Sequence, residues 1–194
     1  MATAKLRGPT FAANEPVVQE NFADVLARKP AFEVAVVDAP IGDASAAALG
    51  ERSADAEARA LLGPSWTLGG GPLRPSDALH LARHAEVAAE MAPYRQRVVF
   101  EGLPELSYFQ LHGGVALEHP RDSPEGLEER LRLFDSSPGL ARLLDPAICP
   151  EPTLAQLDAF ALLWSARRVA ARGPARLPAD PTWDGDGMRV EIVR

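Results

Sequence analysis

The clearest pattern in the chain is a pair of short apolar runs, rich in β-branched residues, that each lead to an acid. The first run covers residues 34–37 and ends at Asp38, and the second lies within residues 97–103 and leads to Glu101. The nearly continuous first run predicts a strand buried on both faces, inside a sheet that helices cover. A further strand is expected at residues 187–194, where apolar and charged residues alternate and one face is buried.

Apolar residues recur at helical spacing between and after these strands. With their capping signals they predict helices over residues 22–28, 53–62 and 77–92, and a helix that begins near residue 124. The best-defined helix lies between Thr153, which opens a capping box with Gln156, and the stop signal at Gly173.

Asp158 lies on this last helix with apolar neighbours at spacings of three and four. A carboxylate in such a position is costly to bury unless it is paired, hydrogen-bonded or bound to a metal. The alternative is a half-exposed Asp at the edge of an amphipathic stripe. Both interpretations stay open for Asp158 on the pattern alone.

Strands that alternate with helices predict an α/β fold, and 194 residues are enough for one domain with a sizeable core. We therefore expect a single domain over residues 1–194, with a mixed sheet of about five strands flanked by helices. A helical insertion at about residues 43–95 separates the two core strands.

Asp38 has two interpretations of equal weight. Open α/β sheets place ligands or metals beside the carboxyl ends of their strands, which is where Asp38 lies. An Asp after a strand also commonly accepts hydrogen bonds from the backbone N–H groups of the following turn.

Composition narrows the classes of function. The formal net charge is −7 at pH 7, which disfavours broad binding to nucleic-acid phosphates. Only two of the 20 basic residues are Lys, so 20 − 2 = 18 are Arg, a bias typical of translation from a GC-rich bacterial genome and weak evidence for phosphate recognition. No stretch is long and apolar enough for a membrane span or a secretory signal, and the single cysteine, Cys149, excludes an internal disulfide. A cytoplasmic protein is the simplest expectation.

Five motifs follow one another along the chain in an order that resembles one family, the domain of unknown function 429. They occupy residues 37–42, 52–63, 101–107, 158–168 and 187–193. The resemblance implies a ribonuclease H-like mixed sheet and a nuclease that hydrolyses phosphodiesters with Mg²⁺ or Mn²⁺. Such hydrolysis is served by two ions about 4 Å apart, held by converging carboxylates.

The resemblance also implies which residues form the site. The catalytic acids and metal ligands would be Asp38, Glu101 and Asp158. The residues that bind substrate phosphate would be Arg52, Arg59 and Arg168.

The chain also departs from the family pattern. The usual first strand, Val-Asp-Gly, with its acid is missing, Leu103 replaces a His, and Leu154 and Ala155 replace acids. A further Ser/Lys-rich stretch reads Arg-Asp-Ser at residues 121–123 and contains no lysine. Losing one carboxylate of a two-metal site normally removes most activity. The expected nuclease therefore has an incomplete metal site.

Three interpretations of these departures stay open. The printed start lies inside a longer reading frame, or another chain supplies the first strand, as a homo-oligomer or a different partner that pairs with an exposed sheet edge. Alternatively, the protein is a degenerate relative, a non-catalytic binding or assembly module that uses the same cleft or the exposed edge.

Overall fold

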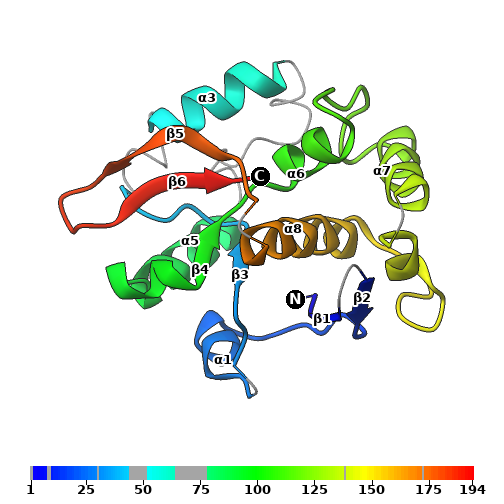
Figure 1. The fold of residues 1–194 in the computed structure, drawn as a ribbon, viewed down its shortest axis with the longest axis horizontal. Helices are drawn as coiled ribbons and strands as arrows, with labels where there is room; N and C mark the ends of the chain where they lie inside the picture. The colour runs from blue at the N-terminus through cyan, green and yellow to red at the C-terminus, as the bar shows by residue number, and fades with distance from the viewer. Residues whose placement is uncertain are drawn as a thin grey trace.

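The structure is a computed structural model that describes residues 2–7, 10–29, 31–43, 52–63, 78–137, 139–171 and 173–194. Figure 1 shows the arrangement of its elements. In chain order the described elements are β1 (Ala4–Arg7), β2 (Thr10–Ala13), α1 (Phe22–Ala27), β3 (Ala35–Val37), α3 (Ser53–Leu62), α5 (Ala78–Glu90), η1 (Pro93–Arg97), β4 (Val99–Glu101), α6 (Pro104–Leu111), α7 (Pro124–Ser136), η2 (Ala141–Leu144), α8 (Leu154–Ala170), β5 (Arg176–Trp183) and β6 (Arg189–Val193).

The central strands form a short mixed sheet. β3 pairs in parallel with β4, and β5 pairs antiparallel with β6. A parallel bridge between Gly102 and Val193 joins the two pairs in the order β5-β6-β4-β3. β1 and β2 form a separate antiparallel hairpin. The expected mixed α/β architecture is therefore confirmed.

Different helices cover the two faces of this sheet (Figure 1). Gly102 faces α8, because a Cβ there would lie 2.3 Å from the Val36 side chain and 2.9 Å from that of Leu162. Val99 precedes Gly102 by an odd number of residues, so it points to the other face, where it packs with Val87 of α5. α3 lies on this second face, against Val190 and the rest of the β5–β6 pair.

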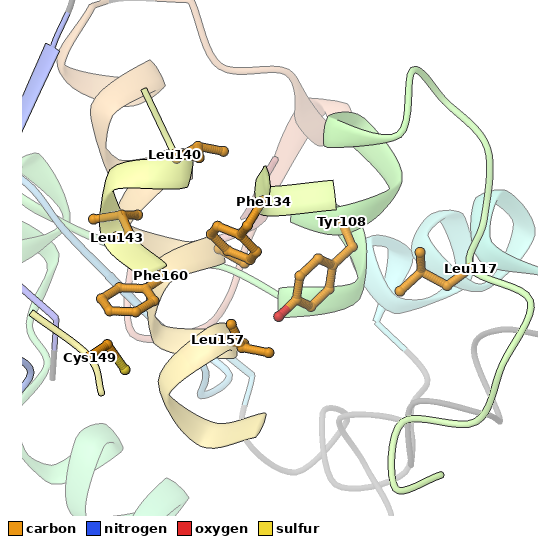
Figure 2. Close-up of a cluster of buried hydrophobic side chains, with 9 residues drawn as sticks. Tyr108, Leu117, Phe134, Leu140, Leu143, Cys149, Leu157 and Phe160 are labelled. Carbon is orange, nitrogen blue, oxygen red and sulfur yellow. The ribbon is translucent and has the colours of Figure 1, made fainter. Parts of the chain in front are cut away.

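One core cluster of the described residues lies between the helices rather than on the sheet. Figure 2 shows the aromatic rings at its centre, where Phe134 of α7 lies between Tyr108 of α6 and Phe160 of α8. The ring centroids are 6.2 Å and 6.3 Å apart in edge-on geometry, which is favourable for aromatic pairs. Cys149 is buried in the same cluster. This core fixes α8 against α6 and so sets the position of Asp158.

The helix predictions agree closely with the structure. α3 covers the predicted residues 53–62, and α8 begins with the predicted capping box between Thr153 and Gln156. Among the described residues, no helix combines the length and the apolar character that crossing a membrane requires.

Two strand predictions are wrong in detail. β3 is not buried on both faces: its residues are half-buried, because it stands at the end of the described sheet and pairs only with β4. β6 is not buried on one face alone, because Glu191 on its charged side is 3 % exposed and pairs with Arg176 and Arg189.

β5 was not predicted. It contains Pro178 and Pro181, which cannot donate to a ladder, and its register shifts between Leu177 and Thr182. Prolines are tolerated on an edge strand, and β5 has that position. The predicted insertion at about residues 43–95 corresponds to α3 and α5 between β3 and β4, although residues 44–51 and 64–77 lie outside the described part.

Candidate functional site

The three predicted site acids do not lie on one side of the sheet. Side chains alternate along a strand, so Glu101 points to the face opposite Gly102 and away from α8. Asp38 follows Val37, the partner of Glu101 in the ladder, and is in step with Val36 on the α8 face. Asp158 lies on α8 itself. The sheet thus separates Glu101 from the other two acids.

Glu101 belongs to a buried ion network with Arg52 and Asp55, which we call the Arg52 network. Arg52 Nη2 donates to Glu101 Oε1 at 2.5 Å and Nη1 to Oε2 at 2.8 Å, while Nε and Nη2 donate to the Asp55 carboxylate at 2.9 Å and 2.8 Å. The side chains of Arg52 and Asp55 are 1 % and 0 % exposed. Burial raises the pKa of the Glu101 carboxyl, and the Arg52 charge works against that rise. One guanidinium therefore bonds to two buried carboxylates and offsets part of their charge.

This network fixes the turn that follows β3. The Ile41 N–H donates to Glu101 Oε2 at 2.7 Å, and Arg52 Nη1 donates to the carbonyls of Ile41 and Gly42. Gly42 has φ +80°, and a Cβ at this position would lie 3.1 Å from the Val190 side chain. Glycine is favoured there on both counts. Glu101 thus positions the segment that carries Asp38.

Asp158 is already engaged by two donors. Tyr108 Oη donates to Oδ1 at 3.0 Å, and Arg121 donates to Oδ2 through Nε at 3.0 Å and Nη2 at 2.5 Å. Asp158 is 7 % exposed. Burial, followed by the nearby Asp158 charge, raises the pKa of the Tyr108 phenol well above its usual value. The apolar surroundings predicted for Asp158 therefore contain the partners that a buried carboxylate needs.

Asp38 and Glu105 share the α8 side with Asp158, and we call these three residues the α8-side acids. Burial, and then repulsion from Asp158, raises the pKa of Asp38 to about 7 and that of Glu105 to about 8. Arg121 works against the rise at Asp38. Asp38 is exposed to solvent, but it lines a concave groove, so protein surrounds its carboxyl on the remaining sides. One Arg121 does not fully compensate the three acids.

The expected two-metal site does not fit these residues. The Glu101 carboxylate is saturated by Arg52 and the Ile41 N–H, and the Asp158 carboxylate by Arg121 and Tyr108. In the described part of the chain, no three His, Cys, Asp or Glu side chains are placed to hold one metal ion. Asp38 is the single expected ligand to which no described residue donates a hydrogen bond.

The predicted phosphate-binding arginines do not gather at the site. Arg52 is already paired with Asp55 and Glu101 in the Arg52 network. Arg59 is exposed on α3, across the sheet from α8. Arg168 stacks on Trp164 with 4.8 Å between its guanidinium carbon and the ring centroid, and it lies ten residues, roughly 15 Å of helix, beyond Asp158.

Three residues of the site were not predicted: Glu105, Tyr108 and Arg121. Glu105 follows a proline at the start of α6, where an acid in the first helical turn is also common for purely structural reasons. Its signal was its place in the Glu-Gly-Leu-Pro-Glu motif. Arg121 occupies the stretch where a lysine was expected and not found. No local pattern marks Tyr108.

Comparison with known proteins gives one match. The family described as "Protein of unknown function (DUF429)" matches residues 75–183, which is more than half of the chain. No curated protein and no solved structure matches.

Proposed function

The chain belongs to the DUF429 family, and on that premise we propose that it is a ribonuclease H-like domain that binds a cationic partner at the α8-side acids rather than hydrolysing phosphodiesters. The observation that carries this proposal is the state of the expected metal ligands. Arginines occupy the carboxylates of Glu101 and Asp158. A site that must converge several free carboxylates on two ions is poorly served by such an arrangement.

The same side of the sheet retains an attraction for positive charge. Asp38 and Glu105 have raised pKa values in part because the α8-side acids repel one another. A cation placed beside them relieves this repulsion and favours their ionised forms. Because Asp38 is exposed, a partner reaches it from solvent without unfolding the site.

A second candidate is the metal-dependent hydrolase that the family resemblance implies. The raised pKa values of Asp38 and Glu105 favour it as well, since a hard divalent cation relieves the same repulsion. It requires Arg121 to leave Asp158, because this arginine holds the carboxylate through two hydrogen bonds.

A polyamine titration tests the binding proposal. We expect spermidine at pH 8 to raise the melting temperature by a few degrees above a NaCl control of equal ionic strength. We expect that increment to vanish in Asp38→Asn and to persist in Asp135→Asn, a matched change at an exposed site on α7.

Hydrolysis is measured on single- and double-stranded DNA and RNA with Mg²⁺ or Mn²⁺. The binding proposal predicts no cleavage above buffer. Metal-dependent cleavage that Asp38→Asn abolishes and Asp135→Asn retains would establish the hydrolase and overturn the binding proposal.

A further inference from the structure

The open side of β3 forms a groove of about 340 Å³, which we call the β3 groove. Its floor is the strand itself and the residues that flank it, 34–39. Residues of α8 line one wall and residues of α1 and α5 line the other, and nearly all of them are apolar. These wall residues are Ala159, Leu162, Leu163, Ala166, Phe22, Val25 and Val87. Ala2, Thr3 and Phe32 also line the groove.

From this geometry we propose that the β3 groove is a docking site for an extended peptide segment that carries a Lys or Arg side chain. The inference rests on the proposed function and specifies its partner. The peptide adds to the sheet as a neighbour of β3, on the side away from β4, and its cationic side chain meets Asp38.

Within the described part of the chain, β3 has backbone hydrogen-bonding groups that have no partner and that such a strand could use. The Ala35 N–H donates to Val98 O at 2.7 Å, and Val37 O accepts from the Gly102 N–H at 2.9 Å, so both residues are directed toward β4. Backbone groups alternate in direction along a strand. The N–H and C=O of Val36 therefore point into the groove, and unpaired main-chain groups at a sheet edge are a template for another strand.

The walls suit the side chains of an added strand. Successive side chains of a strand point to opposite faces. In the groove, one set would therefore meet Leu162 and Ala166 of α8, and the other set would meet Phe22 and Val87 across the strand. β3 spans three residues, or roughly 10 Å. A segment of about five residues is long enough to pair along it.

Negative charge at one end of the groove favours a cationic side chain of the peptide there. Asp38 lines that end, and the charged groups that act on it are Asp158, Glu101 and the opposing Arg121. Arg52 already compensates Glu101 on the other face, so the balance on the α8 side is negative. At the other wall, Arg83 is held by the Glu86 carboxylate and the Glu20 carbonyl. A lysine or arginine near Asp38 thus gains a carboxylate without displacing an existing partner.

The probes are two fluorescein-labelled peptides that place lysine at opposite ends, acetyl-Thr-Val-Thr-Val-Lys-amide and acetyl-Lys-Val-Thr-Val-Thr-amide. Each has a matched form with norleucine in place of lysine. By fluorescence anisotropy at pH 8 we expect one lysine peptide to bind about tenfold more tightly than its norleucine form. Asp38→Asn should remove that tenfold difference, and Asp135→Asn should keep it. The preferred peptide reports whether pairing is parallel or antiparallel.

N-methylated peptides test strand pairing without altering the protein. Methyl groups on the alternate amides that face β3 should abolish binding, and methyl groups on the other amides should leave it unchanged. Equal binding of the two methylated forms would overturn the proposal, and so would no binding of any peptide at 1 mM. A dimer by light scattering that the peptides fail to dissociate would assign the groove to a second copy and also overturn it. If no peptide binds but spermidine still raises the melting temperature, the strand-docking proposal is rejected and the proposed function is retained.

Discussion

Two groups of acids lie at the carboxyl ends of neighbouring strands, and their charge is treated in opposite ways. In the Arg52 network, one buried guanidinium bonds to both Glu101 and Asp55, and all three side chains are shielded from water. Burial raises the pKa of Glu101 in spite of Arg52. Among the α8-side acids, Arg121 bonds to Asp158 alone, and burial together with repulsion from Asp158 raises the pKa of Asp38 to about 7 and that of Glu105 to about 8. Whether a carboxylate at a strand end is structural or can bind a partner thus depends on the cations that already pair with it. Its place in a sequence motif does not decide this.

The largest loss of stability is expected when the buried cation of the Arg52 network is removed. Arg52→Met leaves Glu101 and Asp55 buried without a partner, and we expect the free energy of unfolding to fall by about 3–5 kcal/mol. Urea denaturation followed by circular dichroism measures it.

Arg121→Met is the control in the same experiment. Arg121 is partly exposed and Tyr108 still donates to Asp158 after its loss, so the substitution should cost less than Arg52→Met, about 1–3 kcal/mol. If the two substitutions lower the free energy of unfolding equally, the Arg52 network is not more structural than the α8-side acids, and the comparison is wrong.

The second largest effect is expected from a side chain added between the sheet and α8. Gly102→Ala places a methyl group 2.3 Å from Val36 Cγ1 and 2.9 Å from Leu162 Cδ2, where α8 packs closest to the sheet. We expect a loss of about 1–3 kcal/mol from overpacking, measured as a lower urea midpoint. Gly185→Ala is the matched control, because nothing lies within 4 Å of its added Cβ. A neutral Gly102→Ala would mean that α8 does not approach β4 as closely as described.

The cap of α8 gives a smaller effect that leaves all charges in place. Thr153 accepts a hydrogen bond from the Gln156 N–H, and Gln156 Oε1 accepts from the Thr153 N–H. Thr153→Ala should lower the free energy of unfolding by about 1 kcal/mol. The measured Asp38 pKa should change little, because the substitution alters neither the charge of Asp158 nor its packed position. A large pKa change would show that the α8-side acids depend on the first turn of the helix.

The pH dependence of stability tests the two raised pKa values without any substitution. The pKa of Asp38 rises from 3.8 to about 7 on folding and that of Glu105 from 4.5 to about 8. Between about pH 4 and pH 8 the folded state therefore holds more protons than the unfolded state, and stability falls as pH rises through this window. Melting temperatures at constant ionic strength should decrease from pH 5 to pH 8. The double variant Asp38→Asn, Glu105→Gln should show a flatter profile, and an unchanged slope would exclude these two groups as its source.

The sequence predicted the helices well because their signals are local. The capping box at Thr153 and the amphipathic stripe of residues 53–62 specify α8 and α3 without reference to the rest of the chain. β5 escaped prediction because its prolines argue against a strand, and only its place at the sheet edge tolerates them. Likewise, the apolar run of β3 does not reveal whether a neighbour covers its outer edge.

The site was predictable only in part for a similar reason. Asp38, Glu101 and Asp158 were expected to converge on one site, and the structure places Asp38 and Asp158 on the same side of the sheet. Glu101 points to the opposite face and bonds to Arg52, as the alternation of side chains along residues 99–102 implies for its direction. The partners that decide each role, Arg52 and Arg121, are 49 and 37 residues from their carboxylates. Such pairs have no signature in a local window.

The most direct test of the account is a ¹³C NMR titration of the side-chain carboxyl groups from pH 3 to pH 10. The account predicts two carboxyl resonances with midpoints near 7 and 8, which disappear in Asp38→Asn and Glu105→Gln respectively. If instead every carboxyl group titrates below about pH 5, the α8-side acids are fully compensated, and the distinction between the two groups of acids is wrong.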